Sequence, residues 1–403
     1  MADAPAHLPD KSWLETPGLR AVFNALANEG ETRAVGGCVR NALLGEPIGD
    51  VDLATTLRPK DVIARAEAAG LRAVPTGLDH GTVTVIAAGT GYEVTTLRAD
   101  AETHGRHATV AFHSDWEADA GRRDFTMNAL YASRDGTLHD PLRGYADLMA
   151  RQVRFISDPV ARIREDYLRI LRFFRFFAWY GKGAPDEAAL KACHAERAGL
   201  RNLSRERIGM EVIRVLAAPD PVMALSAMAG ADVSASVFDG DTEPAGVGRL
   251  VALERATGRA PDPLLRLAAL LGAEVNANIL QERLRLSRDQ TEQLKGLADH
   301  HFKAIPNRRM IERAVLNRGN RAAADLLLLS WVFSGETPEH RCWRSAFEIA
   351  RDWQAPHFPL TGDDLIRAGM SPGPQVGEAL WKAKEAWIES GYTLVREELL
   401  SLR

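Results

Sequence analysis

The chain has 403 residues, of which 46% are apolar and 26% are charged, and its formal net charge is −4. This length exceeds a single ordinary core, so we expect about two to four domains. The composition excludes a fibrous or disordered chain. A net charge so close to zero gives no global argument for a nucleic-acid partner, and any RNA-binding surface must therefore be local.

Two features of the sequence bear on where the protein acts. Residues 1–17 mix charged, polar and proline residues without an apolar run, and no later stretch has the roughly eighteen uncharged residues of a membrane span. Cys38, Cys193 and Cys342 lie far apart, which argues against a disulfide framework and against a zinc site. We therefore expect a soluble cytoplasmic protein with no membrane partner.

The first 131 residues alternate short β-rich runs with helical ones. Strand-like runs bounded by Gly, Pro and Asp occupy residues 32–35, 51–54, 82–87 and 92–97. From about residue 157 onward the strand signals vanish, and Leu, Ala, Arg and Glu recur with helical spacing. The pattern predicts an α/β or α+β head followed by a helical remainder, with an internal linker at 237–263.

Two consecutive glycines, Gly36 and Gly37, follow the first strand-like run and begin a short helical run that ends at Gly45. Paired glycines let backbone N–H groups approach a phosphate, and a helix N-terminus adds partial positive charge. Arg40, one turn further along, can add a guanidinium fork to the same anion. Such a pair more often marks a tight turn, so the phosphate interpretation depends on its neighbours.

Asp50 and Asp52 are those neighbours. They stand two residues apart in a strand-like run, so both carboxylates are expected on one face while Val51 and Leu53 point to the core. Side by side they repel, and Mg²⁺, which prefers one or two carboxylates plus substrate phosphates, would remove that repulsion. Two such ions can activate an attacking hydroxyl and stabilise a leaving pyrophosphate. The alternative is a solvated turn that carries two acids.

Two further segments offer polar groups. Glu93 is a lone acid in a β-rich run, where it either completes the metal site from a neighbouring strand or points into water. The segment 122–130 places Arg123, Asp124 and Asn128 close together. These residues either contact the ribose and triphosphate of a nucleotide or form a salt bridge at a helix entry.

The ordered motifs resemble a known family. They are GG-x-V-R at 36–40, D-V-D at 50–52, R-R-D-F-T-M-N-A-L at 122–130 and E-D-Y-L-R-I-L-R at 165–172, with further matches at 203–208, 360–365 and 372–377. Together they span nearly the whole chain. They resemble the class II branch of the nucleotidyltransferase superfamily, which contains the tRNA CCA-adding enzymes and bacterial poly(A) polymerases.

The resemblance implies an α+β fold with a nucleotidyltransferase-type β-sheet head at 1–150. A helical neck that selects the nucleotide (151–216), a helical body (217–300) and a helical body and tail that bind tRNA (301–403) would follow. The implied activity is Mg²⁺-dependent, template-independent addition of CMP and AMP from CTP and ATP to the 3′ acceptor end of tRNA, with release of pyrophosphate. No protein partner is expected.

The predicted site combines three acids with a set of nucleotide contacts. Asp50 and Asp52 are the predicted metal ligands, and Glu93 is the third catalytic acid. The predicted nucleotide-binding residues are Gly36, Gly37, Arg40, Arg123, Asp124, Asn128, Asp166, Arg169, Arg172 and Arg175. The chain departs from the family at Asn41, where members usually have Asp. It also lacks the paired His-Asp of relatives with a phosphohydrolase domain, so no phosphatase activity is expected.

Asp166 and Arg169 can select the base by hydrogen bonding. Cytosine and adenine each present an exocyclic amine beside a ring-nitrogen acceptor, whereas uracil and guanine present a carbonyl beside an N–H donor. A carboxylate and a guanidinium three residues apart on one helix face would therefore accept only the first two bases. On that helix Arg175 would lie nearly opposite Asp166 and would orient the pair or touch a phosphate. The phenylalanines within 173–177 predict that this helix is buried.

Other functions and surfaces stay open. A poly(A) polymerase, an A-only or CC-only enzyme, a non-catalytic RNA-binding relative and a metal-dependent hydrolase are the alternatives. The polar segment 98–122 is expected to be a long loop, and a mobile element that helps to switch nucleotide specificity is one hypothesis for its role. Residues 151–180 carry seven Arg against three acids, and 307–321 form a second basic cluster. Either could meet tRNA phosphates, although a solvated helix face is favoured for the second. Trp343, Trp353 and Trp381 are expected in the core.

Overall fold

The structure is a computed structural model that describes residues 4–27, 30–104, 107–272, 276–298 and 302–402. The chain forms two compact units. The first comprises Met1–Ala245, Pro261–Pro263 and Asn278–Arg288, and the second comprises Gly246–Ala260, Leu264–Ala277 and Asp289–Arg403. The finer domain boundaries at residues 150, 216 and 300 stay predictions.

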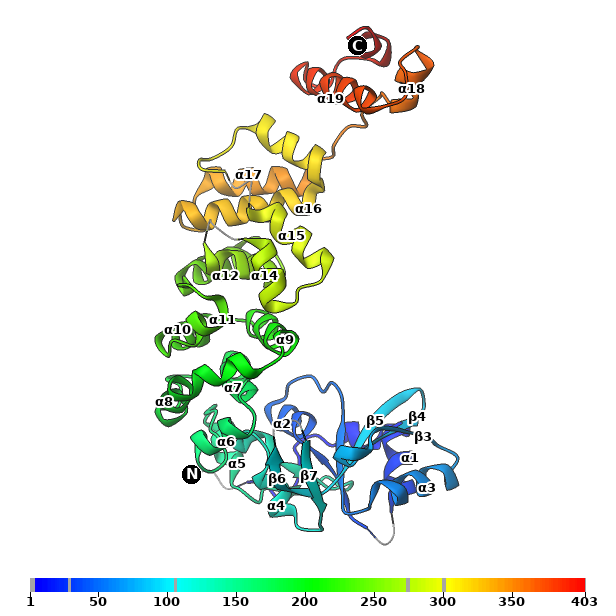
Figure 1. Cartoon of the computed structure of the whole chain (residues 1–403), viewed down its shortest axis with the longest axis vertical. Helices are drawn as coiled ribbons and strands as arrows, with labels where there is room; N and C mark the ends of the chain where they lie inside the picture. Colours follow the sequence, from blue (N-terminus) through cyan, green and yellow to red (C-terminus); the bar gives the residue numbers. More distant parts are fainter. Residues whose placement is uncertain (1–3, 28–29, 105–106, 273–275, 299–301, 403) are drawn as a thin grey trace. The chain divides into compact units, whose positions relative to one another are not determined.

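The head is built on a seven-stranded sheet with the order β3-β4-β5-β2-β1-β8-β9, of which Figure 1 labels β3, β4 and β5. Its strands are β1 Thr32–Val35, β2 Asp52–Thr55, β3 Arg72–Gly77, β4 Thr82–Ala87, β5 Thr90–Thr96, β8 Tyr131–Ala132 and β9 Leu138–His139. Only β2 and β5 pair in parallel, and every other neighbouring pair is antiparallel. The four strands expected from the sequence are confirmed to within two residues.

Helices cover the head sheet and complete its connections. They are α1 Pro17–Leu26, α2 Gly37–Leu44, α3 Pro59–Ala68, α4 Trp116–Gly121 and α5 Gly144–Met149, with short 3-10 turns at Ser12–Glu15, Leu78–His80 and Thr126–Asn128. The prediction of a long loop at 98–122 was wrong. That segment forms a separate two-stranded hairpin, β6 Arg98–His104 and β7 His107–Phe112, followed by α4. Residues 105 and 106, within the same segment, lie outside the described residues.

Beyond residue 139 every regular element in the described part of the chain is a helix, which confirms the α+β class (Figure 1). These helices are α6 Pro159–Glu165, α7 Leu168–Tyr180, α8 Glu187–Glu196, α9 Arg205–Leu216, α10 Val222–Gly230, α11 Val233–Phe238, α12 Pro244–Thr257, α13 Pro263–Leu271, α14 Ala277–Leu284, α15 Arg288–Ala298, α16 Arg308–Ser334, α17 Arg341–Asp352, α18 Gly362–Arg367, α19 Pro374–Glu389 and α20 Arg396–Ser401, with a 3-10 turn at Arg197–Asn202.

The linker predicted at 237–263 is mostly helix. α12 occupies fourteen of its residues, although the change from the first compact unit to the second falls within it at Ala245. Pro244 is compatible with the first turn of a helix, where its missing N–H is not needed. Gly246 is needed for packing, because a Cβ there would lie 2.4 Å from the carbonyl oxygen of Ala269. These residues therefore mark a helix start and a close contact.

An aromatic cluster joins α7 to the head. Phe173 lies 5.8 Å from Phe155 and 6.4 Å from Phe125, and Phe125 lies 5.0 Å from Phe176, measured between ring centroids. All four side chains are buried. Burial of each ring contributes on the order of 2 kcal/mol from apolar area alone. The predicted burial of this helix is confirmed, and α7 is thereby fixed against the segment that carries the 122–130 motif.

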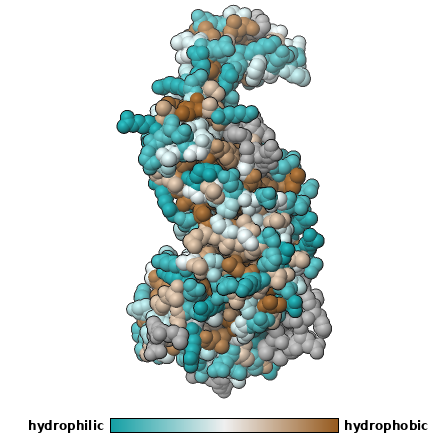
Figure 2. All heavy atoms as spheres, turned by 90° about the vertical axis from the view of Figure 1, so that its left-hand side faces the viewer, coloured by the Kyte–Doolittle hydropathy of each residue, from teal (hydrophilic) through white to brown (hydrophobic). Residues whose placement is uncertain are grey.

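Two of the tryptophan predictions have clear outcomes. Trp343 is 2% exposed and stacks on Trp331, with ring centroids 6.5 Å apart, so it belongs to the core as expected. Trp381 is 62% exposed on α19, and its assignment to the core was wrong. Figure 2 shows hydrophobic residues scattered among hydrophilic ones over the face it presents, as on ordinary protein surfaces. Among the described residues, none of the helices has the length and apolar character of a membrane span.

Several arginines of the second basic cluster have partners within the second compact unit. Arg308 pairs with Glu312 at 2.7 Å, Arg313 pairs with Glu385, and Arg318 donates to the carbonyl of Gly296 at 2.8 Å. These contacts agree with the favoured interpretation of 307–321 as a solvated helix face.

Candidate active site

The glycine turn and Asp52 meet at the end of two paired strands. Val35, the last residue of β1, stands opposite Asp52, the first residue of β2. Gly36 follows with φ 76° and ψ −119°, a backbone conformation that L-residues rarely adopt, and caps the N-terminus of α2. Its own N–H donates to the carbonyl of Leu130. The sequence therefore places the start of a helix beside a carboxylate.

Three acids gather around this point. Asp52 and Glu93 are directly opposed on the parallel strands β2 and β5, so Glu93 stands next to the Asp52 carboxylate. Asp50 precedes β2, so the prediction that both aspartates share one strand was wrong. Desolvation, together with the negative charges of Glu93 and Asp50, raises the pKa of Asp52, and Arg123 offsets this only in part. The carboxylates thus repel one another as the sequence suggested.

This donor set fits a divalent cation. Among the described residues, no group of three or more His, Cys, Asp or Glu side chains is arranged to hold an ion alone. Asp52, with Asp50 and Glu93 close enough to raise its pKa, offers the oxygen ligands that a hard cation takes together with phosphate and water. Such a cation would relieve the repulsion between these acids.

The cavity beside Asp52 has a volume of about 460 Å³. Its lining residues are Gly36, Gly37, Arg40, Asp52, Arg122, Arg123, Asp124, Asn128, Asp166, Leu168, Arg169, Arg172, Phe176 and Arg207. The structure therefore brings together ten of the residues predicted to form the site. Asp50, Glu93 and Arg175 do not line the cavity.

The cavity wall is strongly basic. Among the residues that line it, six are arginines and three are aspartates. Guanidinium groups match phosphate oxygens in geometry as well as in charge. The local basic surface predicted for 151–180 is thus extended by arginines from the head and from α9, and the cavity is suited to a polyanion such as a nucleoside triphosphate.

Arg123 is held in place by a residue that sequence reasoning missed. Asp119 on α4 is fully buried; its Oδ2 accepts from Arg123 Nη2 at 3.1 Å and from the Tyr131 hydroxyl at 2.8 Å. Arg122 donates to the other oxygen of Asp119 at 2.8 Å. Burial alone would raise the pKa of Asp119, but the two arginines outweigh it and the pKa is lowered. Its position four residues before Arg123, on a helix, was the available signal.

Asp124 pairs with the neck. Burial would raise the pKa of Asp124, but Arg172 and Asn128 outweigh it and the pKa is lowered. Arg172 donates from Nε to Asp124 Oδ2 at 2.8 Å, and Asn128 donates to Oδ1 at 2.9 Å. The salt bridge, which was one of the two interpretations of the 122–130 segment, is present. Its partner lies on α7, 48 residues away in the sequence.

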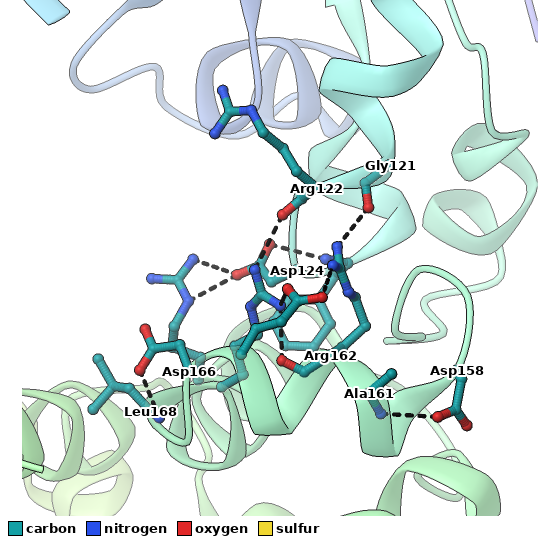
Figure 3. A network of polar contacts seen from close by, with 12 residues as sticks. Gly121, Arg122, Asp124, Asp158, Ala161, Arg162, Asp166 and Leu168 are labelled. Carbon is teal, nitrogen blue, oxygen red and sulfur yellow. Dashed lines mark hydrogen bonds and ion pairs between the residues drawn. The ribbon is translucent and has the colours of Figure 1, made fainter. Parts of the chain in front are cut away.

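The prediction that Asp166 and Arg169 share one helix face was wrong. Asp166 has φ −152° and ψ 105°, an extended conformation between the end of α6 and the start of α7 (Figure 3). One of its oxygens accepts from the backbone N–H of Leu168 at 3.1 Å. The other accepts from Arg207 of α9 at 2.7 Å. Asp166 nevertheless lines the same cavity as Arg169, so the pair stays together by a different geometry.

Arg169 is fixed by acceptors from both head and neck. It donates to Glu165 at 2.6 Å, to the carbonyl of Arg162 at 2.7 Å and to the carbonyl of Arg122 at 3.1 Å. Arg162 in turn donates to the carbonyl of Gly121, at the end of α4. Figure 3 shows the Arg122 carbonyl pointing into this network while its side chain points away. Guanidinium groups thus satisfy carbonyls at a helix C-terminus.

Arg207 and Glu211 are further residues that sequence reasoning did not assign. Arg207 pairs with Asp166, and Glu211, which is 3% exposed on α9, forms an ion pair with Arg175 at 2.7 Å. Arg175 also lies over the ring of Phe176 at 4.6 Å, and burial lowers its pKa. The structure thus gives Arg175 a partner outside the cavity, and its contact with a nucleotide stays a prediction.

A buried thiol next to the glycine turn has no place in the chemistry. Cys38 donates to the carbonyl of Val35 at 3.4 Å. Burial, and then the negative charge of Asp52, raise the pKa of Cys38 to about 12. The thiol is therefore protonated at neutral pH and is a poor nucleophile.

Comparisons with known proteins agree with this geometry. A model of the poly A polymerase head domain matches residues 32–154. The zebrafish (Danio rerio) mitochondrial CCA tRNA nucleotidyltransferase 1 is 34% identical over 95% of this chain and 89% of its own length. The CCA-adding enzyme of Limosilactobacillus fermentum is 29% identical over 94% of this chain and 92% of its own length.

Solved structures extend the likeness to the whole fold. A Bacillus stearothermophilus CCA-adding enzyme in complex with CTP superposes with a TM-score of 0.74 and 28% identity, over 96% of each chain. A Thermotoga maritima CCA-adding enzyme complexed with tRNA has the same fold, with a TM-score of 0.65 at 19% identity, over 95% of this chain and 92% of that one. The chain belongs to the family of CCA-adding tRNA nucleotidyltransferases.

Proposed function

We propose that this protein adds CMP and AMP, taken from CTP and ATP, to the 3′ end of tRNA without a nucleic-acid template. The observation that carries the proposal is a single cavity that joins Asp52 and the Gly36–Gly37 turn to Asp166 and Arg169. The first group suits phosphate chemistry, and the second suits recognition of a base edge. Relatives that match over most of their length and are named CCA tRNA nucleotidyltransferase 1 and CCA-adding enzyme support the same assignment.

The chain's own residues account for most of the transfer step. The 3′ hydroxyl of the tRNA attacks the α-phosphorus of the nucleotide, the new ester bond forms, and pyrophosphate leaves. Arg123, held by Asp119 and Tyr131, stabilises the negative charge on the phosphates, together with the N–H groups at the start of α2. We assign Mg²⁺ to Asp52 with Asp50 and Glu93, where it would supply charge neutralisation at the reacting oxygens.

Base choice belongs to Asp166 and Arg169 in this proposal. A carboxylate can accept more hydrogen bonds than the two that Asp166 receives from Leu168 and Arg207, so it can still accept one from the exocyclic amine of cytosine or adenine. Arg169 donates to the ring nitrogen. Uracil and guanine would set a carbonyl against the carboxylate, which leaves buried polar groups unpaired at a cost of a few kcal/mol.

The decisive experiment uses tRNA that lacks its 3′ CCA. The protein is incubated with this tRNA and each nucleotide singly or in pairs, and the products are sequenced. Addition of C, C and A in that order supports the proposal. Runs of A would instead identify a poly(A) polymerase, and products that stop at CC or that need a preformed CC end would identify a partial enzyme. No extension of any tRNA would reject the function.

Asp166→Ala tests the assignment of base choice. We expect the preference for CTP over UTP to fall by about 10- to 100-fold, because the acceptor for the amine is lost. Competition between the two nucleotides in one reaction measures this ratio. Asp158→Ala is the matched control, because its carboxylate accepts from the N–H of Ala161 (Figure 3) and does not line the cavity. An unchanged ratio in Asp166→Ala would reject the assignment.

We place the protein in the cytoplasm. The scattered free cysteines Cys38, Cys193 and Cys342 support a reducing compartment. Relatives from zebrafish, mouse and human are, by contrast, named mitochondrial enzymes.

A further inference from the structure

Arg40 is enclosed by polar partners from two parts of the first compact unit. It is 6% exposed and donates from Nη1 to Asn128 at 2.6 Å and from Nη2 to the hydroxyl of Tyr180 at 2.8 Å. Its Nε and Nη2 both donate to Asn41 Oδ1, at 3.2 and 3.1 Å. The guanidinium carbon also lies 4.0 Å from the centre of the Tyr180 ring. Tyr180 is the last residue of α7, whereas Arg40 belongs to α2.

The donor count limits what else Arg40 can do. A guanidinium has five N–H bonds, and the four contacts to Asn128, Tyr180 and Asn41 account for four of them. A bidentate fork to a phosphate needs two. Arg40 therefore cannot provide such a fork without breaking a contact within the protein, and burial lowers its pKa. In the fold, Arg40 connects α2 to the end of α7.

Arg40 belongs to a chain of hydrogen bonds that begins and ends on α7. Asn128, which accepts from Arg40, donates to Asp124, and Asp124 accepts from Arg172 of α7. A chain of hydrogen bonds therefore runs from Tyr180 of α7 through the head to Arg172 of α7. These two residues are eight positions apart, or about 12 Å along the helix. Two attachment points at that spacing prevent α7 from tilting relative to α2.

We propose that Tyr180 is a positioning residue for nucleotidyl transfer, which holds α7 in register with the glycine turn through Arg40. The inference rests on the proposed function. Asp166 and Arg169 stand at the start of α7, whereas Asp52 and Gly36 stand beside α2. The distance between the bound base and the attacked phosphorus is therefore set by how these two helices are joined. A misplacement of about 1 Å can slow a reaction by about 100-fold.

Tyr180→Phe isolates the hydroxyl. Phenylalanine keeps the ring over the guanidinium and removes only the acceptor for Arg40 Nη2. In single-turnover reactions with saturating nucleotide, we expect the rate of C addition and of A addition to fall by about tenfold each, while the KM for the nucleotide and the affinity for tRNA change by less than about twofold. The CTP/UTP preference should stay unchanged, since the base contacts are intact.

The matched control is Tyr392→Phe. The Tyr392 hydroxyl donates to Glu312 at 2.8 Å in the second compact unit, so the variant loses a comparable contact in a unit that contributes no residue to the described cavity. Thermal melting confirms that each variant is folded at the assay temperature, and rates are expressed per tRNA-bound enzyme. Rates of Tyr180→Phe within about twofold of the unaltered chain would overturn the inference. Failure of the unaltered chain to extend tRNA would instead reject the function.

Discussion

Asp52→Ala is expected to slow nucleotide incorporation by about 10³- to 10⁴-fold, because it removes a carboxylate from the point where the transferred phosphate and its cation must meet. Binding of tRNA should be nearly unchanged, since phosphate contacts to arginines and lysines dominate RNA affinity. Single-turnover incorporation of CMP measures the rate, and filter binding measures the affinity. Loss of both together would mean that the variant is misfolded rather than inactive.

Two comparisons sharpen the Asp52 experiment. Asp50→Ala should also lose activity, because it removes the second of the two aspartates assigned to the cation. Asp61→Ala is the matched control, since it removes an exposed head carboxylate on α3 that does not line the cavity. If Asp52→Ala retained activity comparable to that of Asp61→Ala, the assignment of the metal site would be wrong.

Asp124→Ala is expected to destabilise the first compact unit by about 3–5 kcal/mol. The substitution leaves the Arg172 guanidinium and the Asn128 amide without their carboxylate partner at a largely buried site. Removal of one partner of a buried ion pair lowers the free energy of unfolding by about this amount. Chemical denaturation monitored by fluorescence measures the difference. An exposed pair, Arg351 with Asp352, provides the control, because Asp352→Ala should leave the transition unchanged.

The pH dependence of this effect has a definite sign. The pKa of Asp124 is lower in the folded chain than in the unfolded chain. Its contribution to stability is therefore fully present above the unfolded pKa of about 3.9 and is lost as the pH falls through the folded pKa. The free-energy difference between the unaltered chain and Asp124→Asn should thus be largest near neutral pH and should shrink in acid. A difference that grew below about pH 4 would contradict this.

Local patterns predicted the head because its chemistry depends on short stretches of sequence. The turn at Gly36 requires a conformation that glycine adopts freely, and Asp52 begins a strand whose inward residues are apolar. Both the turn and the strand were therefore predictable from a few neighbouring residues. Burial of α7 followed from its phenylalanines. The sequence also placed Glu93 in a strand, but only the parallel pairing of β2 with β5 shows that it stands beside Asp52.

The partners of the charged side chains could not be predicted, because they come from distant segments. Asp166 is separated from Arg207 by 41 residues, and Arg40 from Tyr180 by 140. The break between α6 and α7 has no Gly or Pro to signal it, so the segment reads as one helix. The extended backbone of Asp166 also depends on a tertiary contact with α9. Local propensity gives way to such contacts.

The register of the central strands has a consequence for how this chain can vary. Asp52 faces Val35 on one side and Glu93 on the other, so its side chain reaches the phosphate turn only in that alignment. Side chains alternate across a strand, and insertion of one residue within β2, directly after Asp52, would shift the carboxylate by one position and turn it to the opposite face of the sheet. The connection 45–51 outside the strand can absorb length changes. An insertion scan across that boundary should therefore separate tolerated from inactivating positions within one or two residues.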